Sequence, residues 1–359
     1  MATPTARTAE STSAAKAALE DILAEIAVPQ AVLDEAKVRR NLVLEIAMEH
    51  DATRARYVSG SVAHGTHNRP LEDTDCGIKV NRRFEAFRVY GPDGDGRGPE
   101  EFIQLFAGFV LLRLRQRGYP NAEVNLDGNR AIKLEFNERV EIDDWGPVDP
   151  SVDLIVGLAR RAGGLWIPNR RRQGWDPAHP QHHTWLMTER DPKRLRVHRA
   201  HLLRLAKRAV KRDDVAPGRT KVMHSWNLSA LALDVVERTE SLGTDLAGFF
   251  ADASTAIAAG LTDDPSPVVE DPIKLPEGVT RDAAATRLNE MAAVVAEALE
   301  ARSKPGARRV LDALYGPELD AIRERERAGM NRYLKTRGST PAAALPFTAP
   351  TKRTNSDGA

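Results

Sequence analysis

Cysteine is almost absent from this sequence: Cys76 is the one cysteine among 359 residues. A chain with one cysteine cannot form an internal disulfide framework, and it cannot supply the cysteine sets of structural zinc sites. This usage is typical of proteins in a reducing compartment, so we expect a cytoplasmic location. Cys76 itself falls on the core side of a predicted strand, where it is expected to be a small buried residue.

Long hydrophobic runs and an excess of one charge are also missing. No apolar run approaches the roughly 18 residues of a membrane-spanning helix, and the Ser/Thr/Ala-rich start lacks the apolar segment of a signal peptide. We therefore expect no membrane partner. With 52 Lys and Arg against 51 Asp and Glu, the formal net charge is +1. General nucleic-acid binding is therefore not indicated, and any preference for phosphate must be local.

The order of predicted elements divides the chain into two halves. Hydrophobic residues make up 42% of the sequence, enough for a large core. In the first half, helical patterns alternate with strands in "RARYVSG" and "DTDCGIKV" and with a hairpin around Asp127-Gly128. In the second half only helical patterns remain. The fold class is α/β (α+β) with a mixed sheet and a helical C-terminal lobe. The expected parts are a disordered leader (1–11), a core domain with N-terminal helices (12–190), a helical domain (191–336) and a flexible tail (337–359).

Two carboxylates stand one residue apart at the start of a predicted strand. Side chains on a strand alternate between its faces, so Asp73 and Asp75 point away from the core-facing Cys76. At ~4 Å and an effective dielectric of about 20, two such charges repel by roughly 4 kcal/mol. The pair must share a proton or hold a cation, and Mg²⁺ is held by one or two carboxylates together with substrate phosphates. The pattern predicts a metal site that is completed by a phosphate.

The turn before this pair, "GSVAHGT" at residues 60–66, carries groups that suit phosphate. Gly60 lets the backbone approach a ligand closely, and the hydroxyls of Ser61 and Thr66 can donate to phosphate oxygens together with backbone N–H groups. Surface turns commonly contain Gly and Ser, so the turn alone indicates little. Its position directly between a strand and the acid pair is more specific, and it favours phosphate binding.

A two-metal site usually needs a third carboxylate. The segment "VDPSVDLIVGL" offers Asp153, which lies in an apolar predicted strand where an unpaired aspartate is costly. Taken alone, a strand cap or an arginine partner explains Asp153 equally well. Beside Asp73 and Asp75, the metal interpretation is favoured. Three neighbouring acids fall in a predicted loop and are expected to be solvated: Asp143, Asp144 and Asp149.

Together these segments resemble a known superfamily. "GSVAHGT", "EDTDCGI" and "VDLIVGL" resemble the Gly-Ser motif and the acidic triad of the DNA polymerase β-like nucleotidyltransferases. Within it, the sequence is similar to the bacterial CD-NTases, relatives of cyclic GMP-AMP synthase and oligoadenylate synthase. "LWIPNRRRQGWDPAHPQHH", "HLLRLAKRAVKR", "KVMHSWNLSALAL" and "VVEDPIKLPEGV" resemble further segments of that family. The resemblance runs from about residue 12 to about residue 300.

The resemblance implies a polymerase β-like core and roles for the residues above. Asp73, Asp75 and Asp153 would be catalytic and would hold two Mg²⁺ ions, with Mn²⁺ as an alternative metal. Asp153 would also help to activate the attacking ribose hydroxyl. The nucleotide-binding residues would include Gly60, Ser61 and Thr66.

Two further nucleotide-binding residues lie in the helical half. The predicted helix over about residues 193–212 places Arg204, Lys207 and Lys211 on one face. A solvated charged face explains such a run equally well, but Lys207 aligns with the family's triphosphate-binding lysine. Ser225 aligns with a later serine of the family, although a serine before Trp226 is also typical of a helix cap.

The resemblance implies an enzyme that joins nucleoside triphosphates, releases pyrophosphate and makes a cyclic di- or trinucleotide for antiphage signalling. An operon-encoded effector and regulatory or conjugating proteins would be partners, the latter acting at the C-terminal Ala359. Two alternatives remain open: a linear transferase acting on RNA or a small acceptor, and a catalytically idle binding or antitoxin-type relative. The sequence does not specify the bases, the linkage, the ring size, the activator or the oligomeric state.

Other conspicuous residues have ordinary explanations. His64 is expected to be an exposed residue of the turn. The cluster of His179, His182 and His183 lacks a matching partner set, so a zinc site is not expected. The run from Arg170 to Arg172 is expected to be a solvated loop.

Overall fold

The structure, a computed structural model, describes residues 4–71, 73–94, 98–142, 146–213, 220–236 and 241–316. These residues belong to one compact unit, Met1–Gly316. The predicted tail (337–359), the last part of the predicted helical domain, and Asp143 and Asp144 lie outside the described residues. Among the described helices, none is both long enough and apolar enough to span a bilayer.

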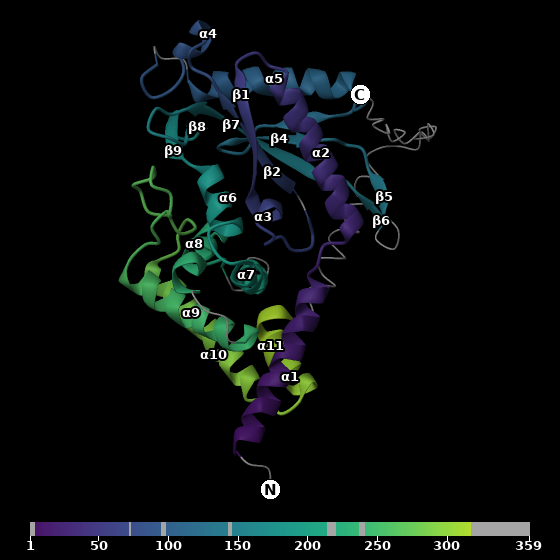
Figure 1. The fold of residues 1–359 in the computed structure, drawn as a ribbon, viewed down its shortest axis with the longest axis vertical. Coiled ribbons are helices and arrows are strands. Elements are labelled where there is room, and N and C mark those ends of the chain that lie inside the picture. The colour runs from purple at the N-terminus through teal and green to yellow at the C-terminus, as the bar shows by residue number, and fades with distance from the viewer. Residues whose placement is uncertain are drawn as a thin grey trace, which may run out of the picture. The chain divides into compact units, whose positions relative to one another are not determined.

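A mixed sheet forms the first half (Figure 1). Its main path runs β1 (Thr53–Ser59), β2 (Asp73–Val80), β7 (Ser151–Ala159), β4 (Ala131–Glu135) and β3 (Glu123–Asn125). The β2/β7 pair is parallel, whereas β1/β2, β4/β7 and β3/β4 are antiparallel. The predicted strands, the hairpin and the mixed sheet are therefore confirmed. The predicted fold class holds for the described residues.

Helices α2 (Gln30–Met48) and α5 (Pro99–Gln116) pack on one face of the sheet. In α5, residues at three- and four-residue spacing are buried against the strands, including Phe102, Phe106 and Val110. Pro99 lies in the first turn of the helix, where the backbone N–H groups have no intrahelical acceptors, so the missing N–H of proline costs nothing. Acidic residues lie in the first turn and basic residues in the last turn, which is the arrangement that the helix dipole favours.

The opposite face of β2 and β7 carries the aspartates Asp73, Asp75 and Asp153. Beyond them, Ile155 packs in a small apolar cluster with Leu165 and Ile167.

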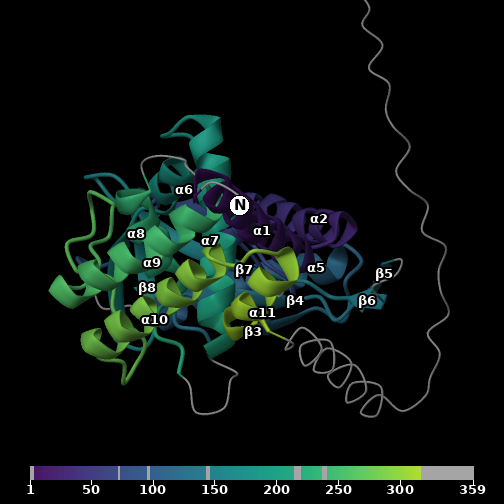
Figure 2. The ribbon, with the colours of Figure 1, turned by 90° about the horizontal axis from the view of Figure 1, so that it is seen from below.

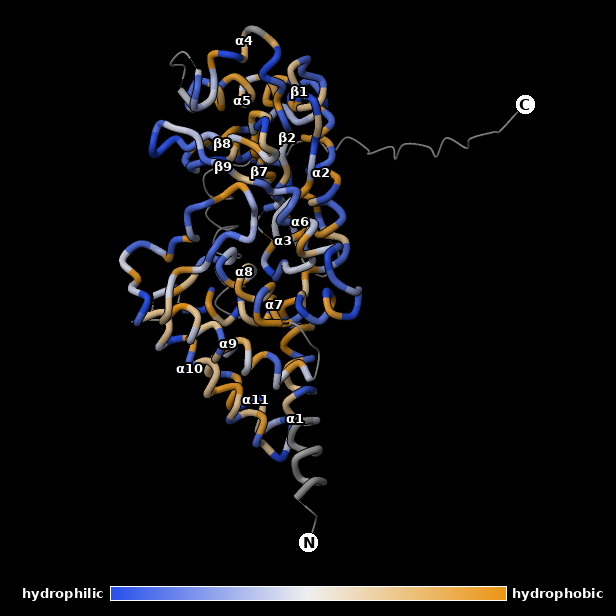
Figure 3. Tube along the Cα trace, turned by 60° about the vertical axis from the view of Figure 1, so that its left-hand side comes forward, coloured by the Kyte–Doolittle hydropathy of each residue, from blue (hydrophilic) through white to orange (hydrophobic). Residues whose placement is uncertain are grey.

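The second half contains helices around a second apolar core (Figures 1 and 3). They are α6 (Pro180–Thr188), α7 (Lys193–Asp213), α8 (Ser225–Val235), α9 (Leu242–Ala259), α10 (Arg281–Leu299) and α11 (Lys304–Tyr315). Within the described part of the chain no strand follows β9 (Gly174–Ala178), and the pairing of Thr262 with Ile273 is an isolated bridge. The predicted change to a helical half is confirmed there.

Helix α1 (Pro4–Glu25) differs from the expectation in two respects. It begins at Pro4, so residues 4–11, for which the composition predicts a disordered leader, are helical. Its buried residues, such as Leu19 and Ile22, belong to the helical core and not to the core under the sheet. Figure 2 shows α1 beside the helices of the second half. The N-terminal segment therefore packs with elements that follow it by more than 200 residues.

Several elements were not predicted from the sequence. The strands β8 (Leu165–Asn169) and β9 (Gly174–Ala178) extend the sheet from β7, and β5 (Val140–Ile142) pairs with β6 (Gly146–Val148). Two short helices, α3 (Gly60–Ala63) and α4 (Glu85–Arg88), complete the described elements.

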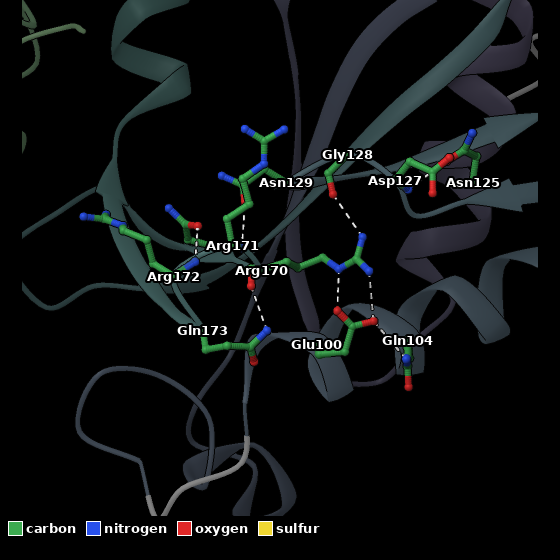
Figure 4. A network of polar contacts seen from close by, with 11 residues as sticks. Glu100, Gln104, Asn125, Asp127, Gly128, Asn129, Arg170, Arg171, Arg172 and Gln173 are labelled. Carbon is green, nitrogen blue, oxygen red and sulfur yellow. Dashed lines mark hydrogen bonds and ion pairs between the residues drawn. The ribbon is translucent and has the colours of Figure 1, made fainter. Parts of the chain in front are cut away.

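The β8–β9 connection corrects one expectation. Arg170 forms an ion pair with Glu100 of α5 and donates to the carbonyl oxygen of Gly128 at 3.0 Å (Figure 4). Arg172 forms an ion pair with Asp176. The arginine run is therefore not simply a solvated loop, since two of its three side chains fasten the turn to neighbouring elements.

Candidate active site

The three aspartates meet on one face of the sheet. In the parallel β2/β7 pair, Asp75 lies directly opposite Asp153, and Asp73 lies two residues before Asp75 on the same face. Thr74 and Cys76 point to the other face and are fully buried. The register therefore brings together two segments that are almost 80 residues apart in the sequence.

The environment of these carboxyls opposes their ionisation. Burial, together with the charges of Asp73 and Asp153, raises the pKa of Asp75 to about 7. Burial and the charge of Asp73 raise the pKa of Asp153 to about 6, although Lys133 on β4 opposes this. The Oδ1 atom of Asp153 is buried and has no hydrogen-bond partner among the described residues. Such an orphaned carboxylate oxygen fits a site that needs a cation.

The turn between β1 and β2 leads the chain past these acids. Gly60 has φ +74°, and a Cβ placed there would lie 1.7 Å from Oδ2 of Asp75, so only glycine fits this approach. The backbone N–H of Ser61 donates to Asp75. The backbone N–H of Thr66 donates to the carbonyl oxygen of Ser61 at 2.9 Å and closes the turn.

Helix α7 brings a lysine to the same turn. The Nζ atom of Lys207 donates to Oγ1 of the buried Thr66 at 2.8 Å. Burial lowers the pKa of Lys207 to about 8, while the charge of Asp75 acts in the opposite direction. Arg204, predicted on the same face, instead donates to the carbonyl oxygen of Leu23 at 3.1 Å. Arg204 also donates to Oδ1 of Asn68, which lines the cavity, at 3.3 Å. Thus α7 presents Lys207 to the turn, while Arg204 contacts both α1 and Asn68.

A cavity of about 360 Å³ lies between the turn, the acids and helices α7 and α8. Seven of the eight predicted site residues line it: Gly60, Ser61, Thr66, Asp73, Asp75, Lys207 and Ser225. Asp153 is outside the lining but directly adjacent to Asp75. Ser225 is the first residue of α8, and the N-cap is His224, which forms a capping box with Asn227. The structure therefore assigns the cap to His224, and Ser225 lies at the cavity wall.

The cavity also contains residues outside the predicted site. Lys221 and Lys211 add positive charge, and Trp226 adds an aromatic ring. His64 is a further member, and the expectation of an exposed histidine is wrong. Its Nε2 lies 3.2 Å from Oγ1 of Thr184, and burial and the nearby Lys207 lower its pKa to about 3. Helical spacing places Lys211 on the face of Lys207, whereas no local pattern distinguishes Lys221 or Trp226 from ordinary loop or helix residues.

The fit to a metal follows from the donor chemistry. Across the described ranges, no group of three or more His, Cys, Asp or Glu side chains forms a ready-made metal site. The three aspartates offer the oxygen donors that hard divalent ions prefer, and the donor set is then completed by substrate phosphates. The residues present fit Mg²⁺ as a partner of a bound triphosphate.

Comparison with known proteins identifies the fold. Neither a protein-family model nor a curated protein matches the sequence. The solved CD-NTase CdnG of Bradyrhizobium diazoefficiens, in complex with GTP, has a TM-score of 0.61 and 17% identity, over 88% of this chain and 98% of that one. CdnC of Escherichia coli MS115-1 with ATP has a TM-score of 0.58 and 14% identity, over 85% and 98%. The Vibrio cholerae cyclic AMP-GMP synthase DncV has a TM-score of 0.51 and 15% identity, over 87% of each chain. The chain therefore has the CD-NTase nucleotidyltransferase fold, as the sequence motifs predict.

Proposed function

We propose that this protein is a nucleotidyltransferase that joins nucleoside triphosphates, with release of pyrophosphate, into a cyclic di- or trinucleotide. One observation carries the proposal: Asp73, Asp75 and Asp153 lie together beside a cavity. Lys207 and the turn that begins at Gly60 line the same cavity. The fold supports it, because similar structures include CdnG in complex with GTP and DncV, a cyclic AMP-GMP synthase.

In this proposal the three aspartates hold two Mg²⁺ ions, or Mn²⁺, which would neutralise phosphate charge and stabilise the attacking and leaving oxygens. Gly60 and Ser61 provide a close backbone approach to the β- and γ-phosphates. Thr66, Lys207 and Ser225 add donors around the triphosphate. Most of the rate enhancement then comes from positioning and from charge neutralisation.

The bond changes are those of an in-line displacement. A 2′- or 3′-hydroxyl oxygen of the acceptor attacks the α-phosphorus, and the bond from that phosphorus to the bridging oxygen breaks, so that pyrophosphate leaves with the electron pair. The carboxylate of Asp153, which lies opposite Asp75, would accept the hydroxyl proton. A last transfer within the linear product, in which its free hydroxyl attacks its own α-phosphorus and pyrophosphate leaves, closes the ring: this is the second transfer for a dinucleotide and the third for a trinucleotide.

Trp226 is the proposed stacking surface for a nucleobase. It borders the cavity, and the flat face of an aromatic ring binds any base by stacking. Together with the cationic side chains that bind phosphate, it would orient the nucleotide from base to triphosphate.

The decisive experiment is a product assay. Purified protein is incubated with the four labelled NTPs and Mg²⁺ or Mn²⁺, and the product is treated with phosphatase. A cyclic product resists the phosphatase, whereas linear products lose their terminal phosphate. The Asp73→Ala/Asp75→Ala double variant should be inactive, and wild-type activity in it would refute the proposed site. Linear products would favour a transferase acting on RNA or a small acceptor, and no product at all would favour an idle relative.

The biological setting is part of the same proposal. We place the activity in the cytoplasm, as an antiphage signal read by an operon-encoded effector. One similar structure is a complex of CdnC with a HORMA partner. Phage challenge of cells that carry the wild-type operon or the double variant tests this role. Conjugation through Ala359 falls outside the described residues, and intact-mass analysis after expression with the neighbouring genes tests it.

A further inference from the structure

A cluster of side chains connects the cavity to the segment that follows α9. Trp226 of α8 borders the cavity, and its Nε1–H donates to Oδ2 of Asp264 at 3.1 Å. The other oxygen, Oδ1, lies 2.8 Å from Nε2 of His183 on α6. The same Oδ1 accepts the backbone N–H of Ser266 at 2.8 Å. One carboxylate thus holds two rings that come from two different helices.

The two rings also pack on each other. The ring centroids of His183 and Trp226 are 4.2 Å apart, and the ring planes are inclined by 33°. His183 therefore covers part of the indole, and Trp226 is also one of the residues that line the cavity. A ring held by both packing and a hydrogen bond has a fixed orientation.

Both carboxylate oxygens of Asp264 have hydrogen-bond partners, although little of the side chain is exposed. Its side chain is 10% exposed and that of His183 is 16% exposed. Burial favours the neutral carboxyl, yet the hydrogen bonds from His183, Ser266 and Trp226 hold the pKa of Asp264 below its usual value. A carboxylate only accepts hydrogen bonds, so Nε2 of His183 carries the hydrogen. Asp264 does not line the cavity, and any effect on a ligand must pass through Trp226.

We propose that Asp264, together with His183, is a positioning residue that fixes the indole of Trp226 and thereby determines how well the cavity discriminates between nucleobases. The inference rests on the proposed function, in which Trp226 stacks on a base. Stacking accepts every base, so discrimination depends on where the ring plane stands relative to the phosphate-binding turn. A loosened indole should weaken binding of all nucleotides and reduce the preference for one base.

The test compares Asp264→Ala and Asp264→Asn with Asp263→Ala. Asp263 is the adjacent acid and is exposed, which makes it a matched control. Loss of base stacking weakens binding by about 5- to 150-fold (about 1–3 kcal/mol, at about 1.4 kcal/mol per factor of ten). We expect Asp264→Ala to raise KM for the preferred NTP by about 3- to 20-fold and to leave kcat within about 2-fold, because the ring is misplaced but present. Asp264→Asn keeps one acceptor oxygen and should fall between Asp264→Ala and the wild type.

A double-variant cycle separates positioning from a general structural effect. If Asp264 acts through the indole, Asp264→Ala should have no further effect on KM in a Trp226→Ala background. Equal effects in both backgrounds, or a KM for Asp264→Ala equal to that of Asp263→Ala, would overturn the inference. Should Asp264→Ala fail to fold, the same cycle is run with Asp264→Asn.

The outcome also distinguishes this inference from the proposed function. A wild-type chain that binds no NTP and makes no product would refute the proposed function, and the claim about base discrimination with it. A wild-type chain that makes product while the Asp264 variants keep its KM and base preference would refute only the role of Asp264. Tryptophan fluorescence gives a direct readout. The emission of Trp226 is the part of the signal that is lost in Trp226→Phe. Acrylamide should quench this part more strongly in Asp264→Ala than in the wild type.

Discussion

The substitution Gly60→Ala tests how closely the turn must approach the acids. At φ +74° an L-residue costs about 1–2 kcal/mol relative to glycine. The added Cβ would lie 1.7 Å from Oδ2 of Asp75 and 2.6 Å from its Cβ, which is far inside contact distance. The carboxylate would have to move away from the N–H of Ser61 and from Asp153. The variant should therefore lose the site geometry as well as stability.

Gly65→Ala in the same turn is the matched control. Gly65 also has positive φ, +68°, but no described atom outside its chain neighbours lies within 4 Å of the position that the added methyl group would take. The positive φ alone should cost each variant about 1–2 kcal/mol of stability, a fall in Tm of roughly 1–3 °C for a chain of this length, and the collision should lower the stability of Gly60→Ala further. The difference between them isolates the collision with Asp75.

The assay is pyrophosphate release from NTPs with Mg²⁺, measured at a temperature where both variants are folded. We expect Gly65→Ala to stay within about 3-fold of wild-type kcat, and Gly60→Ala to lose about 100-fold or more, since a displacement of about 1 Å at a reacting group has an effect of that size. Equal activity of the two variants would show that Asp75 tolerates displacement, and the geometric argument would fail.

Three further results are expected. Asp153→Asn should abolish product formation and raise Tm in EDTA, because it removes a buried charge with an unsatisfied oxygen; a lower Tm contradicts this. In EDTA the free energy of unfolding of the wild type relative to the Asp75→Asn/Asp153→Asn variant, measured by urea titration, should fall as pH rises from about 5 to about 8, because Asp75 and Asp153 keep protons in the folded chain that the unfolded chain releases. The comparison cancels the opposite contribution of His64, whose lowered pKa makes stability rise with pH up to about 6.5. Added Mg²⁺ should reverse that trend, and a flat profile would contradict the raised pKa values. Lys207→Met should raise KM for NTPs by at least about 10-fold through loss of a charge-assisted contact, whereas Lys193→Met, on the exposed first turn of the same helix, should keep the wild-type KM.

The site residues that the sequence predicts are those whose pattern is local. Alternation along β2 places Asp73 and Asp75 on one face, and the spacing along α7 places Lys207 opposite the apolar Leu202 and Leu205. The sequence predicts Asp153 from the cost of an aspartate in an apolar strand. The parallel register of β2 with β7 is a long-range property, so the direct pairing of Asp75 with Asp153 comes only from the structure.

The remaining features depend on contacts between distant segments. Asp149, expected to be solvated, forms an ion pair with the fully buried Arg39 of α2, which also contacts the ring of Phe136 at 4.7 Å. The link from His183 to Asp264 spans 81 positions. In each case the individual residue is ordinary in its own segment, and only the tertiary packing gives it a partner.

The charges around the cavity explain why the site calls for a metal-bound triphosphate. The raised pKa values of Asp75 and Asp153 and the lowered pKa of Lys207 show that burial opposes each charged form. Lys207 acts on Asp75 and Lys133 acts on Asp153, but a bare triphosphate would still be repelled by the three carboxylates. A triphosphate accompanied by divalent cations suits both the acidic and the basic groups of the site, since the cations bind the carboxylates and the phosphates bind Lys207 and the turn. Mg²⁺ and NTP should therefore bind cooperatively, and calorimetric titration of NTP with and without Mg²⁺ should show an affinity that falls when the metal is removed.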